Sequence, residues 1–133
     1  MENGVLRKFN LNWRSLIRAI EKLNGDIRLV SNLMRLNDLV EKDPYRLPLM
    51  RDIIRATQGS RVFTVIDLKE GFYHIEIEDE HKHKTDFEFD GRVYKWNSMV
   101  MGFKNSPHIM QKTMNRVLEE FRGNGVEVYM DDT

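Results

Sequence analysis

Two apolar segments of the sequence each run directly into acidic residues, and this pattern constrains the fold more than any other. Residues 61–68 (RVFTVIDL) are β-branched and apolar on both faces, as is typical of a buried strand, and a carboxylate, Asp67, stands at the end of the segment. Residues 126–129 predict a second, short strand, which is followed by Asp131 and Asp132. If the two strands are neighbours, three carboxylates converge on one point.

Converging carboxylates are favourable only when positive charge lies between them. Like charges at short range raise one another's pKa and oppose folding. Divalent cations remove this penalty, and hard oxygen ligands select magnesium or manganese. Two such ions about 3.5–4 Å apart serve phosphoryl transfer, because one activates the attacking hydroxyl and the other neutralises the leaving group. Aspartates are also ordinary turn residues, so on the carboxylates alone this second interpretation stays open.

The remaining patterns predict an α+β protein rather than an alternating βαβ one. The dipeptide Asn24-Gly25 predicts a hairpin within 16–30, and Asp90-Gly91 predicts another between strands 84–89 and 92–96. Further elements are expected as helices at 32–40 and 49–57 and as a half-exposed strand at 73–77.

The clearest helix is predicted at 107–122. Asn105 or Ser106 can cap it, and Pro107 suits its first turn. Its apolar side chains fall on one stripe at helical spacing: Met110, Met114, Val117, Leu118 and Phe121. A partner surface is one interpretation of this stripe, and packing on the core is the preferred one.

The charges are unevenly distributed although the formal net charge is 0. Residues 1–62 carry 12 Lys and Arg against 7 Asp and Glu, whereas residues 63–133 carry 9 against 14. A basic front and an acidic back suit a protein that contacts phosphates with one part and binds cations with the other, although chance segregation of solvated charges stays open. The sequence has no cysteine, no signal-peptide pattern and no apolar run of about 20 residues. We therefore expect an intracellular protein, cytoplasmic or nuclear, without a membrane partner.

Four ordered motifs resemble those of reverse transcriptases from retroviruses and long-terminal-repeat retrotransposons. Residues 65–72 (VIDLKEGF) look like the motif that holds the first catalytic aspartate, and 129–132 (YMDD) look like the second. Between them, 102–107 (GFKNSP) matches the family's Gly-aromatic-x-x-Ser-Pro signature, and 25–30 (GDIRLV) resembles its fingers segment. The resemblance covers about residues 5–133 and is specific, because the motifs occur in order at family-like intervals.

The resemblance implies a role for each matching residue. The implied catalytic residues are Asp67, Asp131 and Asp132, which with the Leu68 carbonyl would bind two Mg²⁺ ions, or Mn²⁺ in their place. The implied contacts to the incoming nucleotide come from Arg28 and Lys22 at the phosphates, the backbone amides of Glu70 and Gly71, Phe72 at the sugar and Met101 near the sugar and template. For Arg28 and Lys22 a solvated hairpin face is the alternative.

The resemblance also implies the domain organisation. We expect one partial reverse transcriptase domain over 1–133, with a fingers-type segment at about 1–62 and a palm-type segment at about 63–133 that includes a fingers hairpin at 84–96. The implied fold is an α+β fingers–palm fragment with an antiparallel palm sheet packed on helices, without the thumb and the final palm strands. Because metal geometry tolerates little displacement, we expect the isolated chain to be inactive alone.

The implied function is RNA-directed DNA polymerisation by a retroelement Pol protein, with nucleotidyl transfer from a dNTP to a primer 3′-hydroxyl. The expected partners are an RNA or DNA template–primer duplex, deoxynucleoside triphosphates and the thumb and RNase H portion of a Pol polyprotein. The alternatives are a catalytically inactive retroelement remnant and a nucleic-acid-binding module. Metal binding that depends on Asp67 distinguishes the enzyme from these alternatives.

Overall fold

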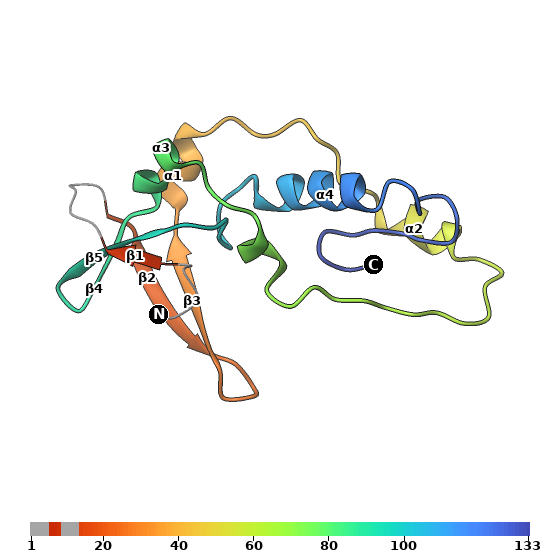
Figure 1. Ribbon diagram of the computed structural model, residues 1–133, viewed down its shortest axis with the longest axis horizontal. Helices are drawn as coiled ribbons and strands as arrows, with labels where there is room; N and C mark the ends of the chain where they lie inside the picture. Colours follow the sequence, from red (N-terminus) through yellow and green to blue (C-terminus); the bar gives the residue numbers. More distant parts are fainter. Residues whose placement is uncertain (1–5, 9–13) are drawn as a thin grey trace. The chain divides into compact units, whose positions relative to one another are not determined.

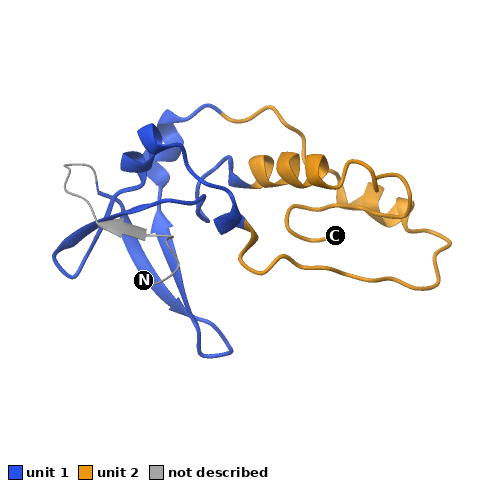
Figure 2. Cartoon of the chain, viewed as in Figure 1, with its two compact units in different colours: residues 1–41, 72–106 blue, residues 42–71, 107–133 orange. Residues whose placement is uncertain are grey.

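The computed structural model describes residues 6–8 and 14–133 (Figure 1). The chain forms two compact units, and each is built from two separate stretches of sequence (Figure 2). Residues 1–41 and 72–106 make the first unit, and residues 42–71 and 107–133 make the second. Among the described residues, no helix is long and apolar enough to cross a membrane.

Two antiparallel sheets lie in the first unit. Strands β2 (Leu16–Glu21) and β3 (Ile27–Asn32) pair along their whole length around the Asn24-Gly25 loop. The other sheet has the order β1 (Leu6–Lys8), β5 (Arg92–Trp96) and β4 (Phe87–Phe89). Both hairpin predictions are confirmed, and in the second one Asp90 and Gly91 have φ values of 52° and 66°, as a type I′ turn requires.

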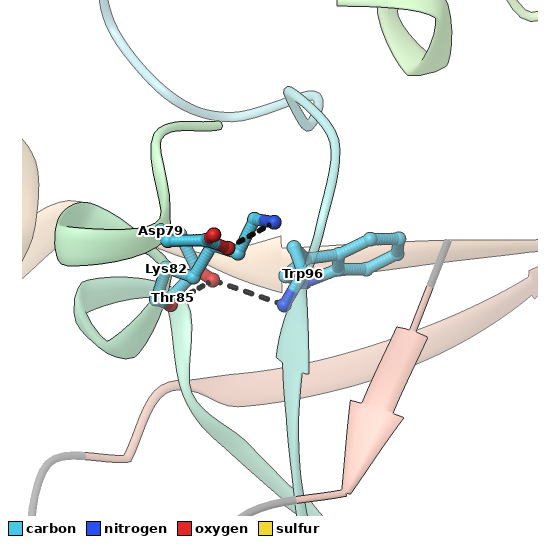
Figure 3. A network of polar contacts seen from close by, with 4 residues as sticks. All are labelled: Asp79, Lys82, Thr85 and Trp96. Carbon is cyan, nitrogen blue, oxygen red and sulfur yellow. Dashed lines mark hydrogen bonds and ion pairs between the residues drawn. The ribbon is translucent and has the colours of Figure 1, made fainter. Parts of the chain in front are cut away.

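Trp96 lies at the centre of the first unit's core. Its indole Nε1 donates to the Ser31 hydroxyl at 2.8 Å, so its polar edge is satisfied although the side chain is buried. Its backbone N–H donates to Thr85 Oγ1 at 3.0 Å, and the Thr85 hydroxyl donates to the Lys82 carbonyl at 2.7 Å (Figure 3). The core cluster consists of Leu33, Leu36, Phe87, Tyr94, Trp96 and Val100. Trp96 is thus buried with hydrogen-bond partners for both of its N–H groups.

Asp86, in contrast, is buried without hydrogen-bond partners for its carboxylate among the residues that the structure describes. It is 0% exposed, and neither of its carboxylate oxygens has a hydrogen-bond partner within the described part of the chain. Burial raises the pKa of this carboxyl, and the charges of Lys95 and His83 oppose the rise without cancelling it. The first unit therefore contains a carboxyl group whose ionisation works against folding.

The half-exposed strand predicted at 73–77 is partly wrong. Residues Gly71–His74 form a 3-10 helix (η1), and extended pairing begins only after it. Met99 N–H donates to the Ile75 carbonyl at 2.7 Å, and Ile77 N–H donates to the Asn97 carbonyl at 2.8 Å. Two further short helices follow, α3 (Asp79–Lys82) and η2 (His83–Thr85), and for this reason the strand predicted at 84–89 begins only at Phe87.

The predicted helices at 32–40 and 49–57 are present as α1 (Met34–Leu39) and α2 (Met50–Ala56). The third, α4 (Ser106–Val117), ends earlier than the predicted 107–122. Met110 and Met114 are buried on it, whereas Val117 is 67% exposed and Phe121 is 54% exposed. The predicted stripe is therefore wrong at its C-terminal end, where the helix loses the packing that sustains helical turns in water.

The apolar segment 61–68 departs furthest from expectation. The sequence predicts a buried strand, but Val62, Phe63 and Val65 are 84%, 62% and 76% exposed. Backbone pairing starts only at Ile66, and the described residues of the second unit provide one pairing partner for it. A strand buried on both faces needs neighbours on both sides and a layer above and below, so apolar composition alone predicts the wrong burial here.

Candidate metal and nucleotide site

A short antiparallel ladder joins the two acidic segments of the second unit. Ile66 and Thr133 exchange two backbone hydrogen bonds, with N···O distances of 2.7 and 2.9 Å. Asp67 lies opposite Asp132 at the next position, and directly opposed residues of an antiparallel pair share one face. The ladder thereby brings together the backbones of the three predicted carboxylates, Asp67, Asp131 and Asp132.

The segment Tyr129–Asp132 folds into a two-residue turn. Tyr129 N–H donates to the Asp132 carbonyl at 2.8 Å, and Asp132 N–H donates back to the Tyr129 carbonyl at 3.0 Å. Met130 has a φ of 55°, in the left-handed region that side chains with a Cβ occupy only at a cost. Such a conformation persists where the surrounding structure holds it.

The side chain of Gln111, from α4, contacts this turn on both sides of Tyr129. Its Oε1 accepts from Met130 N–H at 2.8 Å, and its Nε2 donates to the Val128 carbonyl at 3.0 Å. Nε2 also donates to Asn115 Oδ1 at 3.0 Å, and Asn115 Nδ2 donates to the Tyr45 hydroxyl at 2.6 Å. These residues were not among the predicted site residues, although Gln111 and Asn115 form a polar pair at i and i+4 beside an apolar stripe, which was a signal for them.

A second turn lies just beyond Asp67. Gly71 N–H donates to the Leu68 carbonyl at 3.1 Å, and Glu70, the third residue of the turn, has a φ of 56°. A Cβ on Gly71 would lie 2.8 Å from Asp131 Cβ and 2.8 Å from Met110 Cε. Asp131 therefore packs into a space that exists because residue 71 is glycine.

The other predicted site residues, Lys22, Arg28, Phe72 and Met101, belong to the first unit. Arg28 is exposed on β3 opposite Ile20, and Lys22 begins the hairpin loop, where its N–H donates to the Asp26 carbonyl at 2.7 Å. Phe72 lies in η1 and is half-buried, as is Met101.

The Asn37 side chain holds the loop that follows Met101. Its Nδ2 donates to the Gly102 carbonyl at 2.8 Å, and its Oδ1 accepts from Lys104 N–H at 2.8 Å. Gly102 has a φ of 96°, and a Cβ there would lie 2.9 Å from the Ser31 carbonyl oxygen. The Gly-aromatic-x-x-Ser-Pro segment is thus fixed by a side chain from α1 and by close backbone contact.

The predicted donor set consists of hard oxygen atoms, which suits magnesium or manganese. Asp131 is half-buried, whereas Asp67 and Asp132 are exposed. Among the described residues, the one group of three acidic or histidine side chains with ligand atoms within 4.8 Å of one another is elsewhere, at Glu78, Glu80 and His81. That group is exposed, and its imidazole Nδ1 lies 3.0 Å from Lys84 Nζ. The carboxylate oxygens of the three aspartates do not all lie within 4.8 Å of one another, although their backbones share a ladder. Such a separation is consistent with repulsion between like charges.

Comparison with protein families identifies the family to which the chain belongs. The family model described as "Reverse transcriptase (RNA-dependent DNA polymerase)" matches residues 7–133. The chain belongs to this family. Its relatives within the reverse transcriptases include the Transposon Tf2-3 polyprotein of Schizosaccharomyces pombe, which is 29% identical over 132 residues. This match covers 99% of the chain and 10% of the relative.

A plant virus and an insect transposon provide two further reverse transcriptase relatives. Polyprotein P3 of Commelina yellow mottle virus is 36% identical over 110 residues, covering 81% of the chain and 6% of that protein. The Retrovirus-related Pol polyprotein from transposon 297 of Drosophila melanogaster is 29% identical over 137 residues, covering 99% of the chain and 13% of that protein. The chain is thus reverse transcriptase sequence of the retroelement Pol type and spans a small part of its relatives' length.

Solved reverse transcriptases confirm the predicted fold. The native protease–reverse transcriptase of prototype foamy virus superposes with a TM-score of 0.82 at 27% identity, covering 98% of this chain and 17% of that one. A foamy viral protease–reverse transcriptase in complex with double-stranded DNA gives 0.86 at 26% identity, covering 98% and 23%. The α+β fingers–palm architecture with small antiparallel sheets is therefore established, and the boundary predicted near residue 62 stays a prediction.

Proposed function

We propose that the chain carries the metal-binding and nucleotide-binding part of an RNA-directed DNA polymerase. The polymerase would join deoxynucleotides to a primer 3′-hydroxyl on an RNA or DNA template. The observation that carries this proposal is the ladder in which Asp67 lies opposite Asp132, with Asp131 packed against Gly71. The retroelement polyproteins among the relatives support it, as does the foamy viral enzyme solved with double-stranded DNA.

Two divalent cations, Mg²⁺ or Mn²⁺, would be held by Asp67, Asp131, Asp132 and the Leu68 carbonyl. The hard oxygen donors fit such ions, and Gly71 leaves room for Asp131 beside them. When bound, the cations supply activation of the primer hydroxyl and neutralise the pyrophosphate that leaves. The Leu68 carbonyl already accepts from Gly71 N–H, but a carbonyl oxygen has a second lone pair for a cation.

The residues proposed for the nucleotide act by charge, amide donation and shape. The Arg28 guanidinium would bind the triphosphate in bidentate geometry, with Lys22 as a second cation. The Phe72 ring would crowd a 2′-hydroxyl and so select deoxynucleotides, and Met101 would contact the sugar and template. Of the two proposed amides, that of Glu70 is the better donor, because Gly71 N–H already donates within its turn.

Manganese binding tests the metal site directly. We expect the chain to bind Mn²⁺, as measured by electron paramagnetic resonance of the free ion, and Asp67→Asn to weaken binding at least about tenfold. Asp52→Asn is the matched control, because it removes the same charge from an exposed position on α2. Equal manganese affinity of the parent and Asp67→Asn would refute the proposed site.

Binding of a template–primer duplex separates the remaining alternatives. A chain that binds the duplex but no manganese would be a nucleic-acid-binding module or an inactive remnant. A chain that binds both would fit the polymerase proposal, in which the thumb and RNase H portions of a Pol polyprotein act as further partners. The second result is the expected one, since the ladder and the Gly71 contact both support a site in which the acidic residues would bind a cation.

A further inference from the structure

We propose that Gln111 is a positioning residue for the Tyr129–Asp132 turn, hereafter the metal-binding turn, and that Asn115 and Tyr45 hold its amide in place. This inference rests on the proposed function, because it assigns Gln111 a role toward the carboxylates of that site. Gln111 comes from α4, and two of its side-chain hydrogen bonds go to the backbone on either side of Tyr129. It would act through the turn rather than by touching a cation.

Burial makes the Gln111 bonds difficult to replace. The residue is 0% exposed, and it uses both N–H groups of Nε2 as well as Oε1. Where water cannot enter, a lost partner leaves a donor or acceptor unsatisfied, and this penalty exceeds the net value of an ordinary hydrogen bond. The backbone at Val128 and Met130 is therefore tied to α4 by a side chain with little freedom to move.

The polarity of the network is fixed by the backbone. A backbone N–H at Met130 can only donate and the Val128 carbonyl can only accept, so the Gln111 amide has one orientation. Its remaining N–H then requires the oxygen of Asn115, which directs the Asn115 Nδ2 toward the Tyr45 hydroxyl. The chain of bonds therefore has one consistent arrangement, which links the segment before α2 to the metal-binding turn.

Backbone strain explains why the turn needs such a support. Met130 has a φ of 55°, and the Gln111 bond is made to the N–H of this same residue. Without that bond the turn can relax toward an unstrained conformation. Relaxation would move Asp131 and Asp132, which follow directly, out of register with Asp67.

The test compares Gln111→Met with two controls by amide exchange and by manganese titration. Methionine has nearly the length of glutamine but makes none of its hydrogen bonds. Lys112→Met places the same new side chain at an exposed neighbouring position of α4, and Met114→Ala weakens a buried position of the same helix without touching the network. In Gln111→Met we expect Met130 amide exchange to accelerate at least about tenfold more than exchange of the α4 amides. We also expect the Mn²⁺ dissociation constant to rise about 10–100-fold.

Each result decides the proposal. Normal Met130 exchange in Gln111→Met, or unchanged manganese affinity despite faster exchange, would overturn it. An equal loss of affinity in Met114→Ala would reduce Gln111 to a stabilising residue and would also overturn it. If the parent chain binds no manganese, the proposed function fails, and the role of Gln111 toward a cation fails with it. Met130 exchange would then still report whether Gln111 holds the turn.

Discussion

Replacing Gly71 with alanine should displace the proposed metal-binding turn, Tyr129–Asp132, while the second unit stays folded. The added Cβ would lie 2.8 Å from Asp131 Cβ and 2.8 Å from Met110 Cε. Non-bonded carbon atoms are optimally about 3.5–4.0 Å apart, so each neighbour has to retreat by about 1 Å. The Met110 methyl group is the far end of a flexible side chain and can move, whereas Asp131 Cβ is attached directly to the backbone of the turn.

The expected loss of stability is modest and the expected loss of metal affinity is large. Inserting a methyl group into a packed site costs about 1–3 kcal/mol. Alanine returns about 0.4–1 kcal/mol by restricting the unfolded chain, since the backbone at Gly71 lies outside the left-handed region. Disturbing the groups that orient metal ligands typically costs about 10–100-fold in metal affinity. We therefore expect manganese affinity to fall at least about tenfold when Asp131 is displaced.

Urea denaturation and manganese titration measure the two effects separately. Gly59→Ala is the control, because Gly59 has a φ of 88° and nothing lies within 4 Å of an added Cβ. It should cost about 1–2 kcal/mol through backbone strain and leave manganese affinity unchanged. The reasoning is refuted if Gly71→Ala binds manganese as tightly as Gly59→Ala does.

Three further substitutions probe the supporting structure. Asp86→Asn should raise the free energy of unfolding at pH 7 and flatten its pH dependence, as measured by urea denaturation. Burial raises the pKa of the Asp86 carboxyl above 3.8, so the folded protein binds a proton there more tightly than the unfolded chain does. The parent protein therefore loses stability as the pH rises through the folded-state pKa. An unchanged pH profile would contradict this. Asn37→Ala should lower the free energy of unfolding by about 1–3 kcal/mol, because two hydrogen bonds to the backbone of Gly102 and Lys104 are lost, and an unshifted urea midpoint would contradict it. Glu70→Gly should stabilise by about 0.5–1 kcal/mol in thermal unfolding by relieving a positive φ, whereas a lower melting temperature would contradict that reasoning.

Local turn chemistry was predictable from the sequence. Asn24-Gly25 and Asp90-Gly91 favour the backbone angles of a tight hairpin whatever the rest of the chain does, and both hairpins form. These predictions needed only neighbouring residues.

Burial was less predictable, because it depends on distant partners. Val62 and Phe63 have the composition of a buried strand but are exposed, because no strand of the described structure pairs with them. Val117 and Phe121 continue an apolar stripe beyond the part of α4 that packs. A pattern states which face is apolar and does not state whether anything covers it.

The residues of the candidate site were also predictable only in part. Asp67, Asp131 and Asp132 follow apolar segments, and the predicted pairing of these segments forms, with Asp67 opposite Asp132. The role of the three aspartates toward a cation stays a prediction. Gln111 and Asn37 act on backbone far from them in sequence, and only the folded arrangement of α4 and α1 reveals which carbonyl and amide groups they contact. The sequence therefore indicated the acidic residues of the candidate site but did not indicate the residues that hydrogen-bond to the surrounding backbone.

The exposed segment before Asp67 also has a consequence for solubility. Residues 62–66 (VFTVI) combine high β-propensity with no charge and no proline, and such segments stack with copies of themselves when they are accessible. Arg61 and Asp67 bracket the segment, and flanking charges of this kind oppose stacking. Asp67 would then serve twice: its charge, proposed to bind a cation, would also keep neighbouring molecules from aggregating through the exposed segment that precedes it.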